Sequence, residues 1–171
     1  RLKEGLAHLG LDVPVTYDGG RYVITLPSED VLSRALAVVR KIPGIANVAP
    51  AWAVPSEIEA IREAAADALE AAPAGSFKVE TKRADKAFPL NSIEVSQAVA
   101  PACLERTNRA VDVHEPDVTV RVEITKQKTF VSAARLPGVG GRPVGSTTRL
   151  LSFLSGGIDS PVATWKMIRR G

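Results

Sequence analysis

The heptapeptide VTVRVEI, residues 118–124, alternates apolar and polar side chains without a break. Its four apolar residues would face one side of a β-sheet and its three polar residues the other. This strict period of two predicts a strand with one buried face. Residues 129–134 show a weaker strand pattern, and we expect them to pair with the first strand across Lys126-Gln127-Lys128.

Upstream of this strand, helical and strand patterns alternate. Ser56-Glu57-Ile58-Glu59 has the spacing of a capping box and begins an alanine-rich helix that we expect to run through Ala72. Residues 77–81 alternate like a half-buried strand. Asn91 or Ser92 can begin a further helix, which an interior proline would kink or break. These segments together predict an α+β domain.

The first 54 residues carry the pattern of another small α+β unit. Val13–Tyr17 and Arg21–Leu26 predict a hairpin across an Asp-Gly-Gly turn. Ser28 can cap the helix that follows, which Pro43-Gly44 ends. Residues 45–54 favour one more strand, limited by prolines.

Composition narrows the classes of protein that this chain can belong to. Its 171 residues include 45% hydrophobic residues and a net charge of +3, which excludes a wholly disordered chain and allows one or two domains. The single cysteine, Cys103, excludes an internal disulfide framework and a multi-cysteine zinc site, and we interpret it as a buried structural residue. No apolar run approaches the roughly 20 residues that cross a bilayer. The chain begins with neither Met nor the apolar core of a signal peptide, so we expect a piece of a longer cytoplasmic protein.

Charge is distributed unevenly along the chain. Residues 56–72 contain one basic and five acidic side chains, whereas residues 121–149 contain six basic and one acidic. Basic charge concentrated in this way suits a polyanion-binding surface. Two clusters stand out, and a solvated charged surface is the alternative interpretation for both. They are Lys82, Arg83 and Lys86, and Lys126 with Lys128.

The strongest chemical signal lies near the end of the sequence. Leu150–Leu154 is an apolar run typical of a buried parallel strand, and Ser155-Gly156-Gly157-Ile158-Asp159-Ser160 follows it. Pro161 then stands where the first turn of a helix tolerates proline. Glycines let the backbone turn sharply and expose N–H groups, which favour a phosphate together with the flanking hydroxyls and the start of a helix. A tight turn without a ligand is the alternative. The loop is not a Walker A motif, because it lacks Gly-Lys-Ser/Thr.

The segment SGGIDS at 155–160 resembles the SGGxDS pyrophosphate loop of ATP-pyrophosphatases. A longer match, over residues 138–145, 151–163 and 167–171, resembles the tRNA 4-thiouridine synthetases of the ThiI family. Residues 81–89 and 111–118 are similar to that family's THUMP domain.

This resemblance implies an α+β chain with four parts. They are an N-terminal ferredoxin-like domain at 1–55, a THUMP RNA-binding domain at 56–136, a glycine-rich linker at 137–149 and the start of an α/β ATP-pyrophosphatase domain at 150–171. The implied site residues follow the motifs. Ser155, Gly156, Gly157, Ile158, Asp159 and Ser160 would bind ATP and its pyrophosphate, with Asp159 orienting the backbone or a magnesium ion, and Lys82, Arg83, Lys86, Lys126 and Lys128 would bind tRNA.

The implied reaction uses ATP, with Mg²⁺, to adenylate O4 of the uridine at tRNA position 8, after which a persulfide sulfur displaces AMP. The implied partners are tRNA, a cysteine desulfurase or other persulfide donor, and a second copy of the chain, and a link to thiamine biosynthesis follows from the family. No catalytic residue or metal ligand is expected within 1–171, so this chain alone should be inactive. The alternatives are a non-catalytic THUMP-type RNA-binding module and the THUMP portion of another RNA-modifying enzyme, such as a methyltransferase.

Overall fold

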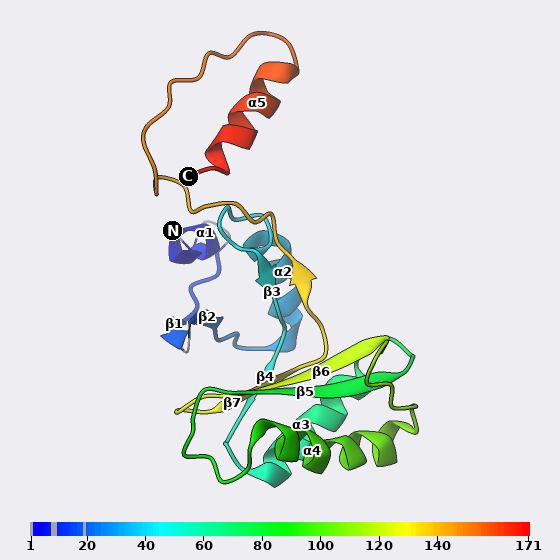
Figure 1. Ribbon diagram of the computed structural model, residues 1–171. Coiled ribbons are helices and arrows are strands. Elements are labelled where there is room, and N and C mark those ends of the chain that lie inside the picture. The colour runs from blue at the N-terminus through cyan, green and yellow to red at the C-terminus, as the bar shows by residue number, and fades with distance from the viewer. Residues whose placement is uncertain (1, 8–9, 19) are drawn as a thin grey trace. The chain divides into compact units, whose positions relative to one another are not determined.

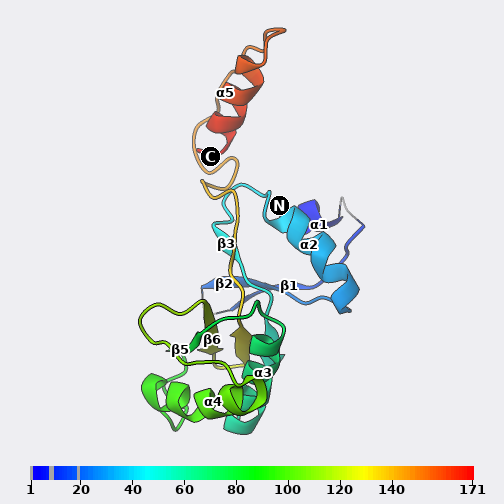
Figure 2. The ribbon, with the colours of Figure 1, turned by 90° about the vertical axis from the view of Figure 1, so that its right-hand side faces the viewer.

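The computed structural model describes residues 2–7, 10–18 and 20–171, which form two compact units (Figures 1 and 2). One unit contains the residues up to Thr16, Tyr22–Val48 and Leu136–Gly171. The other contains Tyr17–Arg21 and Ala49–Arg135. No helix among these described residues is both long and apolar enough to cross a membrane.

A four-stranded sheet in the order β4-β7-β6-β5 organises the second unit. Its strands are β4 (Trp52–Val54), β5 (Phe77–Arg83), β6 (Val118–Ile124) and β7 (Thr129–Ser132). β5 runs parallel to β6, while β6 with β7 and β7 with β4 are antiparallel. The helices α3 (Ile58–Glu70) and α4 (Ser92–Thr107) lie on the same side of this sheet (Figure 1). The strand expected at 118–124 and its pairing with the next strand are confirmed.

The core of this unit lies between the two helices and the sheet. The apolar residues of β6 are all buried, whereas its polar residues are half-buried, which matches the period of two in the sequence. The apolar residues of β6 pack with Ile61 and Leu69 of α3, with Val95 and Val99 of α4, and with Phe77 of β5. Each large aliphatic side chain buried in this way contributes about 1.5–3 kcal/mol to folding.

The two expected helix starts behave differently. Asn91 accepts hydrogen bonds from the N–H groups of Ile93 (2.9 Å) and Glu94 (3.0 Å), and Glu94 accepts one from the Asn91 N–H (2.7 Å), which completes a capping box. The box expected at Ser56 does not form, because the Ser56 hydroxyl bonds Thr129 Oγ1 of β7 at 3.0 Å. Helix α3 therefore begins after Glu57, without a side-chain cap.

Helix α4 contains Pro101, where the sequence predicts a kink or a break, and it continues unbroken to Thr107. Val95, Val99 and Cys103 are fully buried on either side of the proline, and their packing keeps this part of the chain helical. The helix ends at Asn108, which adopts a left-handed conformation with φ of 50°.

The first unit contains shorter elements around a small core of Leu6, Leu11, Ala35 and Val39. They are α1 (Leu2–Ala7), the 3₁₀ helix η1 (Glu29–Val31), α2 (Leu32–Val39), β3 (Asn47–Val48) and β8 (Leu136–Pro137). Helix α5 (Asp159–Ile168) belongs to the same unit and has no buried residue. The strands β1 (Val15–Asp18) and β2 (Arg21–Ile24) are divided between the units, because residues 17–21 belong to the second. β1 and β2 form the expected hairpin, although Gly19 of its turn lies outside the described residues. Ser28 precedes η1 but makes no side-chain capping bond.

Two expected strands are wrong in the form predicted. The segment 45–54 divides into β3 and β4, and these join different sheets, because Pro50 interrupts the extended backbone between them. Leu150–Leu154 forms no strand, and the exposed fractions of Leu151 and Phe153 are 79% and 83%. An isolated strand leaves its backbone groups unpaired, and no described strand lies in register beside this segment.

Candidate functional site

Parallel pairing brings two predicted basic clusters to one end of the sheet. Arg83, the last residue of β5, lies in register with Ile124, the last residue of β6. The carbonyl of Ile124 accepts hydrogen bonds from the N–H groups of Ala84 (2.8 Å) and Asp85 (3.3 Å). The loop after β5, residues 84–91, therefore begins beside the β6–β7 turn at residues 125–128.

Four lysines on these segments are exposed to solvent, and we call them the basic edge. They are Lys82, Lys86, Lys126 and Lys128. Because ammonium groups exposed at one end of a sheet attract polyanions, this arrangement suits binding to the phosphates of a nucleic acid.

A buried threonine supports the turn that carries two of these lysines. Thr125 is 1% exposed, and its hydroxyl donates to the Lys128 carbonyl at 2.8 Å. The same oxygen accepts hydrogen bonds from the N–H groups of Gln127 and Lys128, both at 3.3 Å. The turn is thus held from inside, while the side chains of Lys126 and Lys128 extend into solvent.

An acidic residue beside the basic edge is neutralised. Glu123 lies in register with Lys82, and its carboxylate forms an ion pair with Arg21. The lysine therefore keeps most of its attraction for an external anion. Sequence reasoning missed Arg21, because a contact between residues 21 and 123 leaves no local signal.

Arg83 differs from the four lysines. It is half-buried, and its Nη1 donates to the carbonyl oxygens of Phe88 and Leu90, both at 2.8 Å. Nη1 of this predicted tRNA contact thus binds the backbone of its own loop.

The SGGIDS segment forms a loop closed by its own hydroxyls. The Ser160 hydroxyl accepts a hydrogen bond from the Ser155 N–H at 2.8 Å, and the two serine hydroxyls lie 3.0 Å apart. The Gly157 N–H donates to Ser155 Oγ at 3.3 Å. Helix α5 follows directly, and within the described part of the chain no side chain caps its start at Ile158. Uncapped N–H groups at a helix start favour an anion such as a phosphate.

The backbone conformation of this loop does not require glycine at Gly156 or Gly157. Neither has a positive φ, so the sharp turn expected from the sequence does not require glycine. A Cβ at Gly156 would meet nothing within 4 Å, and one at Gly157 would meet only Ser155 Oγ at 3.6 Å. The space above the backbone is open, so a ligand can approach the N–H groups closely.

Other candidate groups have structural surroundings. Burial raises the pKa of the Cys103 thiol to about 11, and the side chain is fully enclosed in the core. Asp159 is exposed in the first turn of α5. Among the residues that the structure describes, no group of three or more His, Cys, Asp or Glu side chains is arranged to hold a metal ion.

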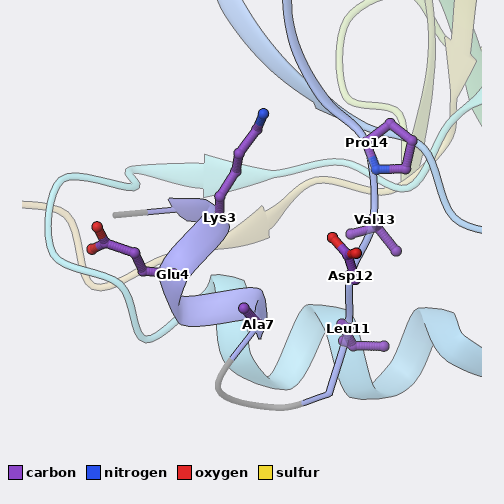
Figure 3. A pocket seen from close by; sticks show the side chains of 7 residues that line it. All are labelled: Lys3, Glu4, Ala7, Leu11, Asp12, Val13 and Pro14. Carbon is purple, nitrogen blue, oxygen red and sulfur yellow. The ribbon is translucent and has the colours of Figure 1, made fainter.

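Pockets lie in the first unit. The larger, of about 510 Å³, lies between α1 and the segment that follows it (Figure 3). Its lining residues are Lys3, Glu4, Ala7, Leu11, Asp12, Val13 and Pro14. The other, of about 440 Å³, lies beside Arg40, Lys41 and Pro137. Neither pocket contains a residue of the basic edge or of the SGGIDS loop.

Comparison with known protein families matches two parts of the chain. Residues 55–134 match the THUMP domain, and residues 145–171 match the family described as thiamine biosynthesis protein (ThiI). The resemblance stated from the sequence motifs is confirmed.

Curated relatives are similar over most of this chain. A probable tRNA sulfurtransferase from Caldanaerobacter subterraneus subsp. tengcongensis is 43% identical over 149 residues, which are 86% of this chain and 39% of the relative. One from Natranaerobius thermophilus is 38% identical over 178 residues, covering 99% of this chain and 43% of the relative. The chain thus spans less than half the length of these relatives.

A solved structure has the same fold. The crystal structure of a 4-thiouridine synthetase–RNA complex with bound ATP matches 99% of this chain with a TM-score of 0.85 and 28% identity, over 44% of that protein. The mixed α/β architecture with a THUMP domain is therefore confirmed.

Proposed function

We propose, from the premise that this chain resembles the N-terminal part of the ThiI-family tRNA sulfurtransferases over nearly its whole length, that it is the tRNA-binding portion of an enzyme that makes 4-thiouridine. One observation carries the proposal: an exposed basic edge on a THUMP fold and an open SGGIDS loop occur in the same chain. The enzyme parent accounts for both features, whereas a non-catalytic RNA-binding module leaves the loop unexplained.

The basic edge provides affinity for RNA in this proposal. Lys82, Lys86, Lys126 and Lys128 contact phosphates of tRNA, which supply affinity and orientation and carry no sequence information. The ion pair between Arg21 and Glu123 supports this role, because it removes a competing carboxylate next to Lys82.

The SGGIDS loop holds the pyrophosphate part of ATP. The N–H groups at the start of α5 and the hydroxyls of Ser155 and Ser160 provide donors around an open backbone. Asp159 orients the loop or a magnesium ion carried by the phosphates. The apolar and exposed Leu150–Leu154 precedes this loop.

The proposed domains follow the same division. Residues 1–55 form a ferredoxin-like domain, 56–136 the THUMP domain, 137–149 a linker and 150–171 the start of the ATP-pyrophosphatase domain. ATP makes O4 of uridine 8 a good leaving group by adenylation. A persulfide from a cysteine desulfurase or similar donor supplies the sulfur, outside this chain. We place the enzyme in the cytoplasm with its tRNA, as a homodimer, with a further link to thiamine biosynthesis.

The binding claim is tested with the chain and an unmodified tRNA transcript. Replacing all four lysines of the basic edge by alanine should lower the slope of log affinity against log salt by about 2.8–3.6, at roughly 0.7–0.9 per phosphate contact. A quadruple alanine variant at the exposed Lys3, Lys41, Lys166 and Arg170 removes the same number of positive charges and controls for net charge. An equal loss in both variants would assign the basic edge to an ordinary solvated surface.

A further inference from the structure

The loop that carries Lys86 has an internal support. Arg83 leaves the end of β5 and its Nη1 reaches the carbonyls of Phe88 and Leu90, 2.8 Å from each. The two acceptors lie five and seven residues further along the chain. One guanidinium nitrogen therefore joins the start of the loop to its end.

Two further contacts fix the same loop. Asp85 accepts a hydrogen bond from the Ala87 N–H at 2.9 Å, which turns the backbone at Lys86. Phe88 is only 8% exposed and packs into the core of the second unit. Lys86 thus lies between the turn at Asp85 and the buried Phe88, and its own side chain is exposed.

Both N–H groups of Arg83 Nη1 are already used by these contacts. Hydrogen bonds from a charged donor are stronger than those from a neutral one, and both would be lost if Nη1 turned toward an external phosphate. The four lysines have no comparable cost, because their side chains are exposed.

We propose that Arg83 is a positioning residue for RNA binding: it holds the 84–90 loop so that Lys86 stands at the same end of the sheet as the other lysines of the basic edge, and it does not itself contact phosphate. This inference rests on the proposed tRNA binding and assigns a different role to one residue of the predicted contact set.

The experiment compares salt slopes for tRNA binding in four variants of the chain. Arg83→Met keeps the apolar stem and removes the guanidinium. Lys86→Ala removes one phosphate contact, and the double variant combines both changes. Arg109→Met is the matched control, because Arg109 also donates to two carbonyls, those of Pro73 (2.8 Å) and Ala72 (3.0 Å), near the opposite end of β5.

If Arg83 acts through Lys86, then Arg83→Met, Lys86→Ala and the double variant should each lower the slope by the same 0.7–0.9 or so. Arg109→Met should leave the slope unchanged. Cleavage by trypsin after Lys86 should be faster in Arg83→Met than in the wild-type chain, because the loop has lost its tether. If Arg83→Met does not fold, Arg83→Gln, which keeps an amide donor on a shorter stem, takes its place.

Two outcomes overturn the inference while tRNA binding stands. A slope reduced by about 1.4–1.8 in the double variant would make Arg83 a phosphate contact in its own right. An unchanged slope in Arg83→Met would make it a residue of stability alone. A wild-type chain without salt-dependent affinity for tRNA would instead overturn the proposed function, and the inference with it.

Discussion

A substitution at Gly156 of the SGGIDS loop should affect ligand binding without affecting the stability of the fold. A Cβ at this position meets nothing within 4 Å, and its φ lies outside the positive range that favours glycine. Gly156→Val should therefore change the free energy of unfolding by no more than about 0.5 kcal/mol, as expected of a surface substitution without strain.

A second glycine provides the contrast. A Cβ at Gly138 would overlap the carbonyl oxygen of Ile45, whose N–H and C=O groups are held by backbone hydrogen bonds. Gly138→Ala should cost about 1–3 kcal/mol through forced displacement of the backbone. Since 1 kcal/mol shifts Tm by about 2–4 °C at this size, thermal unfolding of the two variants distinguishes them.

The ligand requirement is measured in the full-length parent. Gly156→Val should lower tRNA-dependent release of pyrophosphate by about 10²-fold or more, because the added side chain occupies the space through which a phosphate approaches the backbone. Affinity for tRNA should remain at the wild-type value. Normal pyrophosphate release in a well-folded variant would refute the assignment of this loop, and a loss of stability in Gly156→Val would refute the argument from open space.

Three further predictions concern the second unit. Asn91→Ala should lower the free energy of unfolding by about 1 kcal/mol through loss of the capping box, measured in a denaturant titration. Cys103 should resist a thiol reagent in the native state and react on unfolding, and because its pKa is raised to about 11, its contribution to stability should be complete below pH 9 and decline as pH rises toward 11. Hydrogen bonds from Ser76 hold the pKa of Asp117 below its usual value, so Ser76→Ala should raise that pKa in an NMR titration, and the stabilisation by Asp117 should disappear as pH falls through the lowered pKa.

Local sequence patterns correctly predicted the elements that have a clear hydrophobic periodicity or a pairing partner close in the chain. VTVRVEI alternates because one face of β6 meets two helices, and the hairpin with β7 needs only a short turn. Leu150–Leu154 shows the limit of such reasoning, because an apolar run says nothing about which strand would pair with it. Ser56 and Asn91 both had capping signals, and the difference between them depends on Thr129, more than 70 residues after Ser56.

The candidate site was predictable in its residue types and not in its arrangement. Both basic clusters could be read from the sequence, and the parallel register of β5 and β6 brings their loops together. The structural use of Arg83 depends on two carbonyl groups, which carry no sequence signal. Resemblance to a family is the basis of the proposed function, and the contacts distinguish the exposed lysines from an internally bonded arginine.

The sheet order β4-β7-β6-β5 has a consequence for synthesis on the ribosome. β4 (Trp52–Val54) is the first strand of this sheet to be synthesised, and it pairs with β7 (Thr129–Ser132), which is the last. β4 therefore has no partner strand until β7 has been made. Helices α3 and α4 can form earlier, but their apolar faces stay without a sheet until residue 132 has left the exit tunnel. We therefore expect this unit to fold late and in a single step, and nascent chains stalled before Thr129 to be far more sensitive to protease than those stalled well beyond Ser132.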